Sequence, residues 1–196
     1  LPLLSDQNFS LLVISCFFLA AAGYIINDYF DLKTDYINRP NQVLIGKNIS
    51  RRVAMAMHLG LTFVGIVLMA FVAYKIQLPF LVVVGLLVSG LLWFYSTTYK
   101  HQFIIGNLII ALLAFLVVAM VPLFEPEFFN LLFSENELLG QAILMVIGFY
   151  AAVVFLLAFV HTLVKDMEDL EGDSKVASNT IPLVLGINNS RWVVMG

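Results

Sequence analysis

Long charge-free stretches alternate with short polar segments along this chain, and they predict membrane-spanning helices. A helix needs roughly 20 apolar residues to cross about 30 Å of hydrocarbon. The stretches long enough for a complete crossing lie between Asp6 and Asp28, Arg52 and Lys75, Lys75 and Lys100, Lys100 and Glu125, and Glu137 and Lys165. The pattern therefore predicts five complete transmembrane helices. A sixth, partial helix is expected from Ile181, in a stretch that contains Arg191.

Prolines mark the boundaries of several of these stretches. Pro40 is expected to end the first helix, and Pro79 is expected to begin a new helix after a tight hairpin. Pro122 and Pro126 are expected to end the fourth helix. The segment from Glu125 to Glu137 is rich in phenylalanine, and we expect it to form a short helix in the outer membrane interface.

Composition supports a membrane protein. The chain is 61% hydrophobic and 12% charged, with a mean hydropathy of +0.97, whereas soluble domains are about 45–50% apolar and about 25% charged. The expected fold is all-α, a multi-pass transmembrane helix bundle. The net charge is −3, and the charged residues are segregated into loops rather than spread over a surface, so no nucleic-acid surface is evident. Cys16 is the single cysteine, which excludes disulfides and cysteine-based metal sites.

Basic residues predict how the helices are oriented, because Lys and Arg are retained on the cytoplasmic side. The segments 28–52, 100–102 and 165–180 hold most of them, whereas the alternate loops hold only Lys75. We therefore expect an integral membrane protein with its acidic motifs at the cytoplasmic face.

Two acidic motifs follow apolar stretches. Asn27, Asp31 and Asp35 are spaced four apart, so on a helix they form one oxygen-bearing column. A second set with similar spacing is expected to share one face of another helix: Asp166, Asp169 and Asp173. Neighbouring carboxylates repel one another unless a cation lies among them, and oxygen ligands suit Mg²⁺. The sequence predicts two Mg²⁺-binding faces that together hold one diphosphate.

Simpler interpretations exist for these residues. The aspartates could belong to a solvated loop that caps a helix, but ionisable groups so near a bilayer are costly and usually functional. Lys33, Arg51 and Lys100 could simply be the positive residues that orient the helices in the membrane. Some of them are also expected to neutralise phosphate charge. The three histidines could suggest haem, but they are not placed as facing partners within the membrane.

The motifs resemble those of the UbiA superfamily of intramembrane prenyltransferases. The resemblance rests on Asn27-Asp28-x-x-Asp31-x-x-x-Asp35, Asn38-Arg39-Pro40-Asn41, Lys165-Asp166-Met167-Glu168-Asp169-Leu170-Glu171-Gly172-Asp173 and Thr180-Ile181-Pro182. It implies a bundle of nine helices. The chain starts at Leu1 without Met and stops at Gly196 within an apolar run, so we expect 1–196 to be a single membrane-embedded domain, incomplete at both ends.

The resemblance also implies an activity, the Mg²⁺-dependent transfer of a polyprenyl group from its diphosphate to a lipid-soluble acceptor in the bilayer. Its implied metal ligands are Asn27, Asp31, Asp35, Asp166, Asp169 and Asp173, of which Asp31, Asp35, Asp169 and Asp173 are the expected catalytic residues. The expected substrate-binding residues are Tyr95, Lys100 and Asn107, together with Lys33 and Arg51. No protein partner is predicted.

The acceptor stays open between two branches. The second motif is most similar to the branch that adds geranylgeranyl to geranylgeranylglycerol phosphate, and the alternative is an aromatic acceptor of the quinone or chlorophyll type. A different class, the ion-coupled transporter, could also use intramembrane carboxylates. CDP-alcohol phosphotransferases are disfavoured because the chain contains no Asp-Gly pair.

Overall fold

The computed structural model describes residues 5–176 and 178–195. Every secondary-structure element named in that part of the chain is a helix. The two ends of the predicted domain, Leu1 and Gly196, lie outside the described residues. The elements in chain order are α1 (Asp6–Asn38), α2 (Arg51–Lys75), α3 (Phe80–Thr97), the 3₁₀ turn η1 (Tyr99–His101), α4 (Ile105–Ala119), α5 (Val121–Phe124), α6 (Pro126–Glu135), α7 (Glu137–Glu168), α8 (Leu170–Lys175), α9 (Ile181–Leu185) and α10 (Ile187–Met195). The all-α expectation is confirmed.

Four of the described helices, α1, α2, α3 and α7, are long and apolar enough to cross a membrane. Their lipid-facing character is clearest on α7, where Leu138, Met145 and Phe149 are all at least 70% exposed. Side chains of this kind are stable only against lipid or another apolar surface. The chain is therefore an integral membrane protein.

The predicted fourth complete span is wrong. α4 has 15 residues, so at 1.5 Å per residue it is about 22 Å long and falls short of the hydrocarbon thickness. It ends at Ala119, and the chain continues as the separate short helix α5, which contains Pro122. Proline lacks the amide hydrogen that a continuous helix needs. The following segment forms α6 as expected, and its place in the outer interface stays a prediction.

The partial sixth span also differs from the expectation. The segment after Ile181 forms two short helices, α9 and α10, because the chain turns at Gly186 with φ +80°. Glycine adopts this backbone conformation without steric cost.

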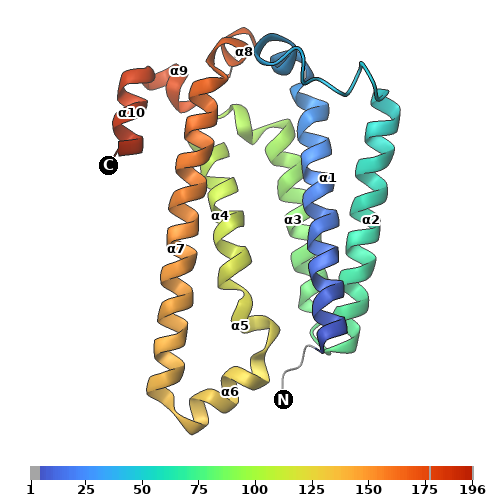
Figure 1. Cartoon of the computed structure of the whole chain (residues 1–196), viewed down its shortest axis with the longest axis vertical. Coiled ribbons are helices and arrows are strands. Elements are labelled where there is room, and N and C mark those ends of the chain that lie inside the picture. Colours follow the sequence, from blue (N-terminus) through green and yellow to red (C-terminus); the bar gives the residue numbers. More distant parts are fainter. Residues whose placement is uncertain (1–4, 177, 196) are drawn as a thin grey trace.

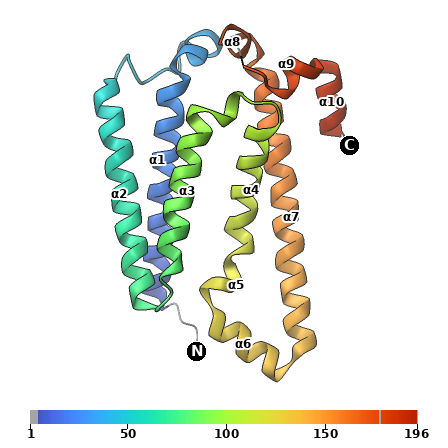
Figure 2. The same ribbon diagram turned by 180° about the vertical axis from the view of Figure 1, so that it is seen from behind.

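The helices form two packed groups that meet at one end. α1, α2 and α3 pack on one another, and α4 packs along α7 (Figures 1 and 2). The buried core of the first group includes Leu12, Leu19, Met69, Val72 and Leu81. The end of α1, the turn η1 and α8 lie at one end of the molecule, and α5 and α6 lie at the other. This arrangement brings the end of α1 to the end of α7, where both acidic motifs lie.

Candidate active site

The first acidic motif forms the predicted column. Asn27, Asp31 and Asp35 all lie on α1, and Nδ2 of Asn27 donates a hydrogen bond to Oδ2 of Asp31 at 2.8 Å. The helix ends one turn later, where the amide of Arg39 donates to the carbonyl oxygen of Asp35 at 2.8 Å. Asp35 therefore lies in the last turn of α1.

The second motif does not share one helical face, and that prediction is wrong. Asp166 lies on α7, which ends at Glu168, and Asp169 occupies the break before α8. Asp173 lies on α8, and its amide donates to the carbonyl oxygen of Asp169 at 3.0 Å. The break bends the motif, so its three carboxylates come from two helices and the residue between them.

Both motifs nevertheless line one cavity of about 50 Å³. Its lining residues come from α1, α3, η1, α7, the break and α8: Asn27, Asp31, Thr34, Asp35, Tyr95, Lys100, His101, Thr162, Lys165, Asp166, Asp169 and Asp173. All six predicted metal ligands are among them, so the two motifs converge as the sequence predicted.

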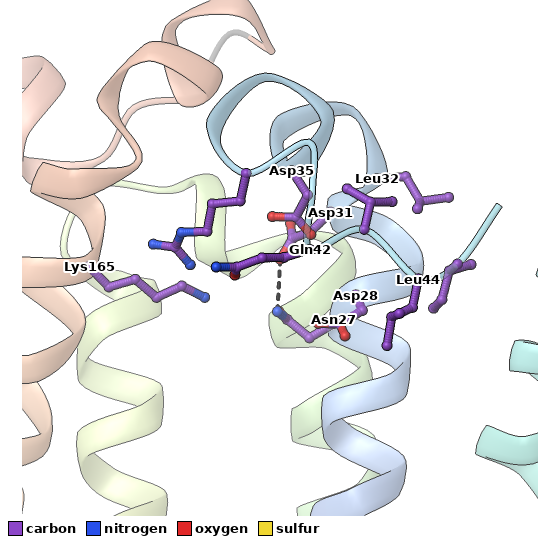
Figure 3. Close-up of a pocket in the computed structure, with 11 residues that line it drawn as sticks. Asn27, Asp28, Asp31, Leu32, Asp35, Gln42, Leu44 and Lys165 are labelled. Atoms are coloured by element: carbon purple, nitrogen blue, oxygen red, sulfur yellow. Dashed lines mark hydrogen bonds between the residues drawn. The ribbon is translucent and has the colours of Figure 1, made fainter. Parts of the chain in front are cut away.

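An adjoining cavity of about 140 Å³ shares part of this lining (Figure 3). Asn27, Asp31, Asp35 and Lys165 line both cavities. The additional lining comes from α1 and from the segment after it: Asp28, Leu32, Arg39, Gln42, Val43, Leu44 and Ile45. The side of α1 that carries the first motif therefore borders both cavities.

Basic side chains from distant parts of the chain pair with the carboxylates of both motifs. Lys100 forms an ion pair with Asp31, and these side chains are only 8% and 15% exposed. Nη2 of Arg39 lies 3.0 Å from Oδ1 of Asp169 and 3.2 Å from Oε2 of Glu168. The pairs hold η1 against α1 and the end of α1 against the end of α7. They also place fixed positive charge beside the space that an anion would occupy.

Burial and crowding shift the ionisation of groups near the break. Burial, followed by the charges of Asp166, Asp169 and Asp31, raises the pKa of Asp173 to about 6. Burial also raises the pKa of Asp169, although Arg39 opposes that shift. Burial and, for Asp173, the neighbouring carboxylates disfavour the ionised forms, so a bound divalent cation would favour ionisation.

The predicted substrate-binding residues occupy different places. Tyr95 and Lys100 line the cavity. Asn107 is buried on α4 and donates to Oδ2 of Asp166 at 2.7 Å, so it orients a carboxylate of the second motif. Lys33 is exposed, and the guanidinium of Arg51 lies 4.5 Å from the ring centroid of Tyr29. Neither Lys33 nor Arg51 lines either cavity.

Among the lining residues that sequence reasoning did not assign to the site are three with basic side chains, Arg39, Lys165 and His101. Lys165 had an available signal, because it directly precedes Asp166 at the end of an apolar stretch. Burial and the nearby charge of Lys100 lower the pKa of His101, and its Nδ1 lies 2.6 Å from Oγ of Ser178. That contact joins η1 to the segment before α9.

The oxygen-rich lining fits Mg²⁺. Residues 5–176 and 178–195 contain no group of three or more His, Cys, Asp or Glu side chains gathered as a metal cage. Mg²⁺ does not require one, because it usually binds through one or two carboxylates together with substrate phosphates and water. Oδ1 of Asn27 is buried and accepts no hydrogen bond from the described residues, which leaves an oxygen ligand available beside Asp31.

These features define the class of protein: a helical intramembrane protein in which two aspartate motifs meet at one end of the bundle. The model of the UbiA prenyltransferase family matches residues 2–196, and the chain belongs to this family.

Two similar proteins are named digeranylgeranylglyceryl phosphate synthase. The chain is 33% identical over 183 residues to a digeranylgeranylglyceryl phosphate synthase of Thermococcus sibiricus, covering 92% of this chain and 58% of the relative. It is 35% identical over 185 residues to the protein of the same name from Methanothermobacter thermautotrophicus, covering 93% and 58%. The chain thus spans less than two thirds of the length of these relatives.

A solved structure, from work on digeranylgeranylglyceryl phosphate synthase in membranes, is also similar. It matches with a TM-score of 0.56 at 26% identity and covers 97% of this chain and 61% of the other. The similarity therefore extends over nearly all of the present helices.

Proposed function

We propose that this protein transfers a polyprenyl group from its diphosphate to a lipid-soluble acceptor in the membrane, in a Mg²⁺-dependent reaction. The observation that carries the proposal is the shared cavity, because Asp31 and Asp35 of the first motif line it together with Asp169 and Asp173 of the second. Membership of the UbiA prenyltransferase family supports the same reaction class.

The proposed metal ligands are the six motif residues that line the cavity: Asn27, Asp31, Asp35, Asp166, Asp169 and Asp173. Bound Mg²⁺ would supply positive charge that stabilises the departing diphosphate. Lys100, Lys165 and Arg39 add positive charge from the protein itself, because all three line one or both cavities. They hold the diphosphate in place without transferring a proton.

The prenyl chain is proposed to lie toward the apolar interior of the bundle. When the carbon–oxygen bond to the diphosphate breaks, the diphosphate leaves with the bonding electrons and positive charge develops on the allylic carbon. The acceptor oxygen or carbon forms the new bond there and gives up its own proton, which the released diphosphate can accept. Tyr95 lines the cavity, and its ring face can stabilise such a cation. Exclusion of water by the surrounding helices protects the cation from hydrolysis.

The proposed acceptor is geranylgeranylglycerol phosphate. The similar proteins are named digeranylgeranylglyceryl phosphate synthases, and that name supports a glycerol-phosphate acceptor over an aromatic one. We further propose that the site faces the cytoplasm, because the basic residues expected on that side flank both motifs.

The transporter alternative has less support. Transporter ion sites usually lie near the bilayer midplane at broken helices. Here the aspartate motifs lie at the ends of α1 and α7, at one end of the bundle (Figure 1). Cation uptake into liposomes that contain the protein and no prenyl diphosphate would favour transport.

The proposal is tested by incubating the protein with labelled geranylgeranyl diphosphate, with and without Mg²⁺. Geranylgeranylglycerol phosphate and aromatic acceptors are offered separately, and the product is identified by mass. We expect the digeranylgeranylated glycerol phosphate only with Mg²⁺. An aromatic product would reassign the acceptor, and Mg²⁺-independent turnover would overturn the proposed chemistry.

A further inference from the structure

Asn38, the last residue of α1, forms two hydrogen bonds to the backbone of the second motif. Its Nδ2 donates to the carbonyl oxygen of Asp169 at 3.2 Å, and its Oδ1 accepts the amide hydrogen of Gly172 at 2.8 Å. α1 and α8 contact each other at this end of the molecule (Figures 1 and 2). One side chain on the helix of the first motif thus holds two backbone groups of the second.

These bonds stabilise the break between α7 and α8. The amides in the first turn of a helix have no partner within that helix and need an acceptor from elsewhere. Asp169 precedes α8 but does not cap it with its own side chain. Asn38 supplies the acceptor for Gly172 from a different helix. The bend in the second motif therefore depends on a contact from α1.

The same contact controls where the carboxylates of the second motif lie. The carbonyl of Asp169 that accepts from Asn38 also accepts from the amide of Asp173 at 3.0 Å. The neighbouring residue, Arg39, pairs with the Asp169 carboxylate at 3.0 Å. Asn38 holds the backbone that carries both aspartates, and Arg39 orients one of their side chains.

Gly172 leaves room for this contact. A Cβ atom built on Gly172 would lie 2.5 Å from Nδ2 of Asn38 and 2.9 Å from its Cγ and Oδ1, closer than real Cβ contacts. The Asn38 amide could move aside only by giving up its two backbone hydrogen bonds. Any larger residue at position 172 would therefore break the link between the motifs.

We propose that Asn38 is a positioning residue that sets the second aspartate motif against the first, and that Gly172 is required to admit it. This inference rests on the proposed function, in which both motifs bind one metal diphosphate. Asn38 acts through the backbone of Asp169 and Asp173. Residues that orient metal ligands typically change metal affinity by about 10–100-fold when they are removed.

Binding of Mn²⁺ with inorganic pyrophosphate tests the proposal without requiring turnover. Mn²⁺ stands in for Mg²⁺, and its binding to the detergent-solubilised protein is followed by electron paramagnetic resonance. Asn38→Ala is expected to raise the Mn²⁺ concentration at half-saturation at least about 10-fold. It is also expected to speed amide hydrogen exchange in residues 169–176, because the backbone there loses its partner.

Asn136→Ala is the matched control. Asn136 also uses its side chain to hold a backbone amide, that of Leu139 at 3.0 Å, but it does so at the opposite end of α7. We expect its Mn²⁺ affinity and the exchange of residues 169–176 to match those of the unaltered protein. If Asn136→Ala weakened Mn²⁺ binding as much as Asn38→Ala does, the effect would be general destabilisation and the proposal would fail.

A double substitution tests the role of Gly172. Gly172→Ala alone is expected to weaken Mn²⁺ binding about as much as Asn38→Ala, because the added methyl displaces the amide. In Asn38→Ala/Gly172→Ala the methyl occupies the space that the amide leaves, so the loss should not exceed that of Asn38→Ala. If the fold losses of Mn²⁺ affinity in the two single variants multiplied in the double variant, the two residues would act independently and the proposed contact between them would be wrong.

Two further outcomes separate the inference from the function on which it rests. Unchanged Mn²⁺ affinity in Asn38→Ala, with or without faster exchange, would overturn the positioning role and leave the proposed function standing. If the unaltered protein failed to bind Mn²⁺ in the presence of pyrophosphate, the proposed metal-diphosphate site itself would be wrong, and the inference would fall with it.

Discussion

Lys100 forms an ion pair with Asp31, across the contact between η1 and α1. Both side chains are largely buried, so each charge depends on the other for compensation. Asp31 is also the central residue of the first motif and accepts a hydrogen bond from Asn27. A lysine thus stabilises the carboxylate that we assign to a metal, and the proposed diphosphate would give that lysine a second anionic partner.

Loss of Lys100 should destabilise the protein and make it more dependent on Mg²⁺. Lys100→Gln leaves the Asp31 charge buried without its cation, so we expect the free energy of unfolding to fall by up to about 3 kcal/mol. Mg²⁺ should restore part of this loss, and Lys100→Gln/Asp31→Asn should restore most of it without metal. Thermal unfolding in detergent measures all three, and equal stability of Lys100→Gln and the unaltered protein would contradict the pairing.

Individual motif aspartates should differ sharply from a neighbouring acidic residue. Asp31→Asn and Asp169→Asn are expected to lower turnover by at least about 100-fold, because each removes charge stabilisation of the leaving diphosphate. Glu171→Gln is the control, since Glu171 lies within the second motif but is exposed and pairs with Lys175. Near-normal turnover in either aspartate variant would count against the site.

Replacing Arg39 should weaken prenyl diphosphate binding, whereas replacing Arg51 should not. Arg39 lines the larger cavity, whereas Arg51 stacks on Tyr29 outside both cavities. A charged hydrogen bond contributes about 1.5–3 kcal/mol, so Arg39→Ala should raise the KM for prenyl diphosphate about 10–100-fold. Arg51→Ala should leave that KM nearly unchanged. Steady-state kinetics decide between them, and the reverse order would favour the assignment of Arg51 made from sequence.

Stability without metal should depend on pH through Asp173. Its pKa is raised from 3.8 to about 6, so the folded state binds a proton more tightly than the unfolded state does. Its contribution to stability is therefore full below about pH 4 and is lost as the pH rises through 6. Asp173→Asn should stabilise the metal-free protein at pH 7 by about 1–3 kcal/mol. Parallel pH profiles for the variant and the unaltered protein would contradict this ionisation.

The periodicity of the sequence was sufficient to predict the first motif. The four-residue spacing of Asn27, Asp31 and Asp35 needs only a helix to become a column, and the apolar stretch before it predicts that helix. The convergence of both motifs followed from the expected alternation of helices across the membrane. Those features depend on local spacing and on polarity, which the sequence displays directly.

Features set by tertiary contacts were not predictable in the same way. The break at Asp169 is held by Asn38 and Arg39, which are more than a hundred residues away in sequence. Whether a basic residue near the motifs faces the cavity depends on the path of the chain after α1, so Arg39 could not be preferred over Lys33 or Arg51. Pro122 marked the end of the fourth helix to within a few residues, but the charge-free stretch that continues to Glu125 made the helix look long enough for a complete span.

The central claim is that the two aspartate motifs grip one diphosphate together, and a structure with ligands tests it most directly. The protein would be determined with Mg²⁺ and geranylgeranyl thiodiphosphate, an analogue that resists cleavage. We predict that the diphosphate lies in the shared cavity, with Mg²⁺ joining it to Asp31 of the first motif and to Asp169 or Asp173 of the second. A diphosphate bound through one motif alone, or bound outside this cavity, would contradict the account.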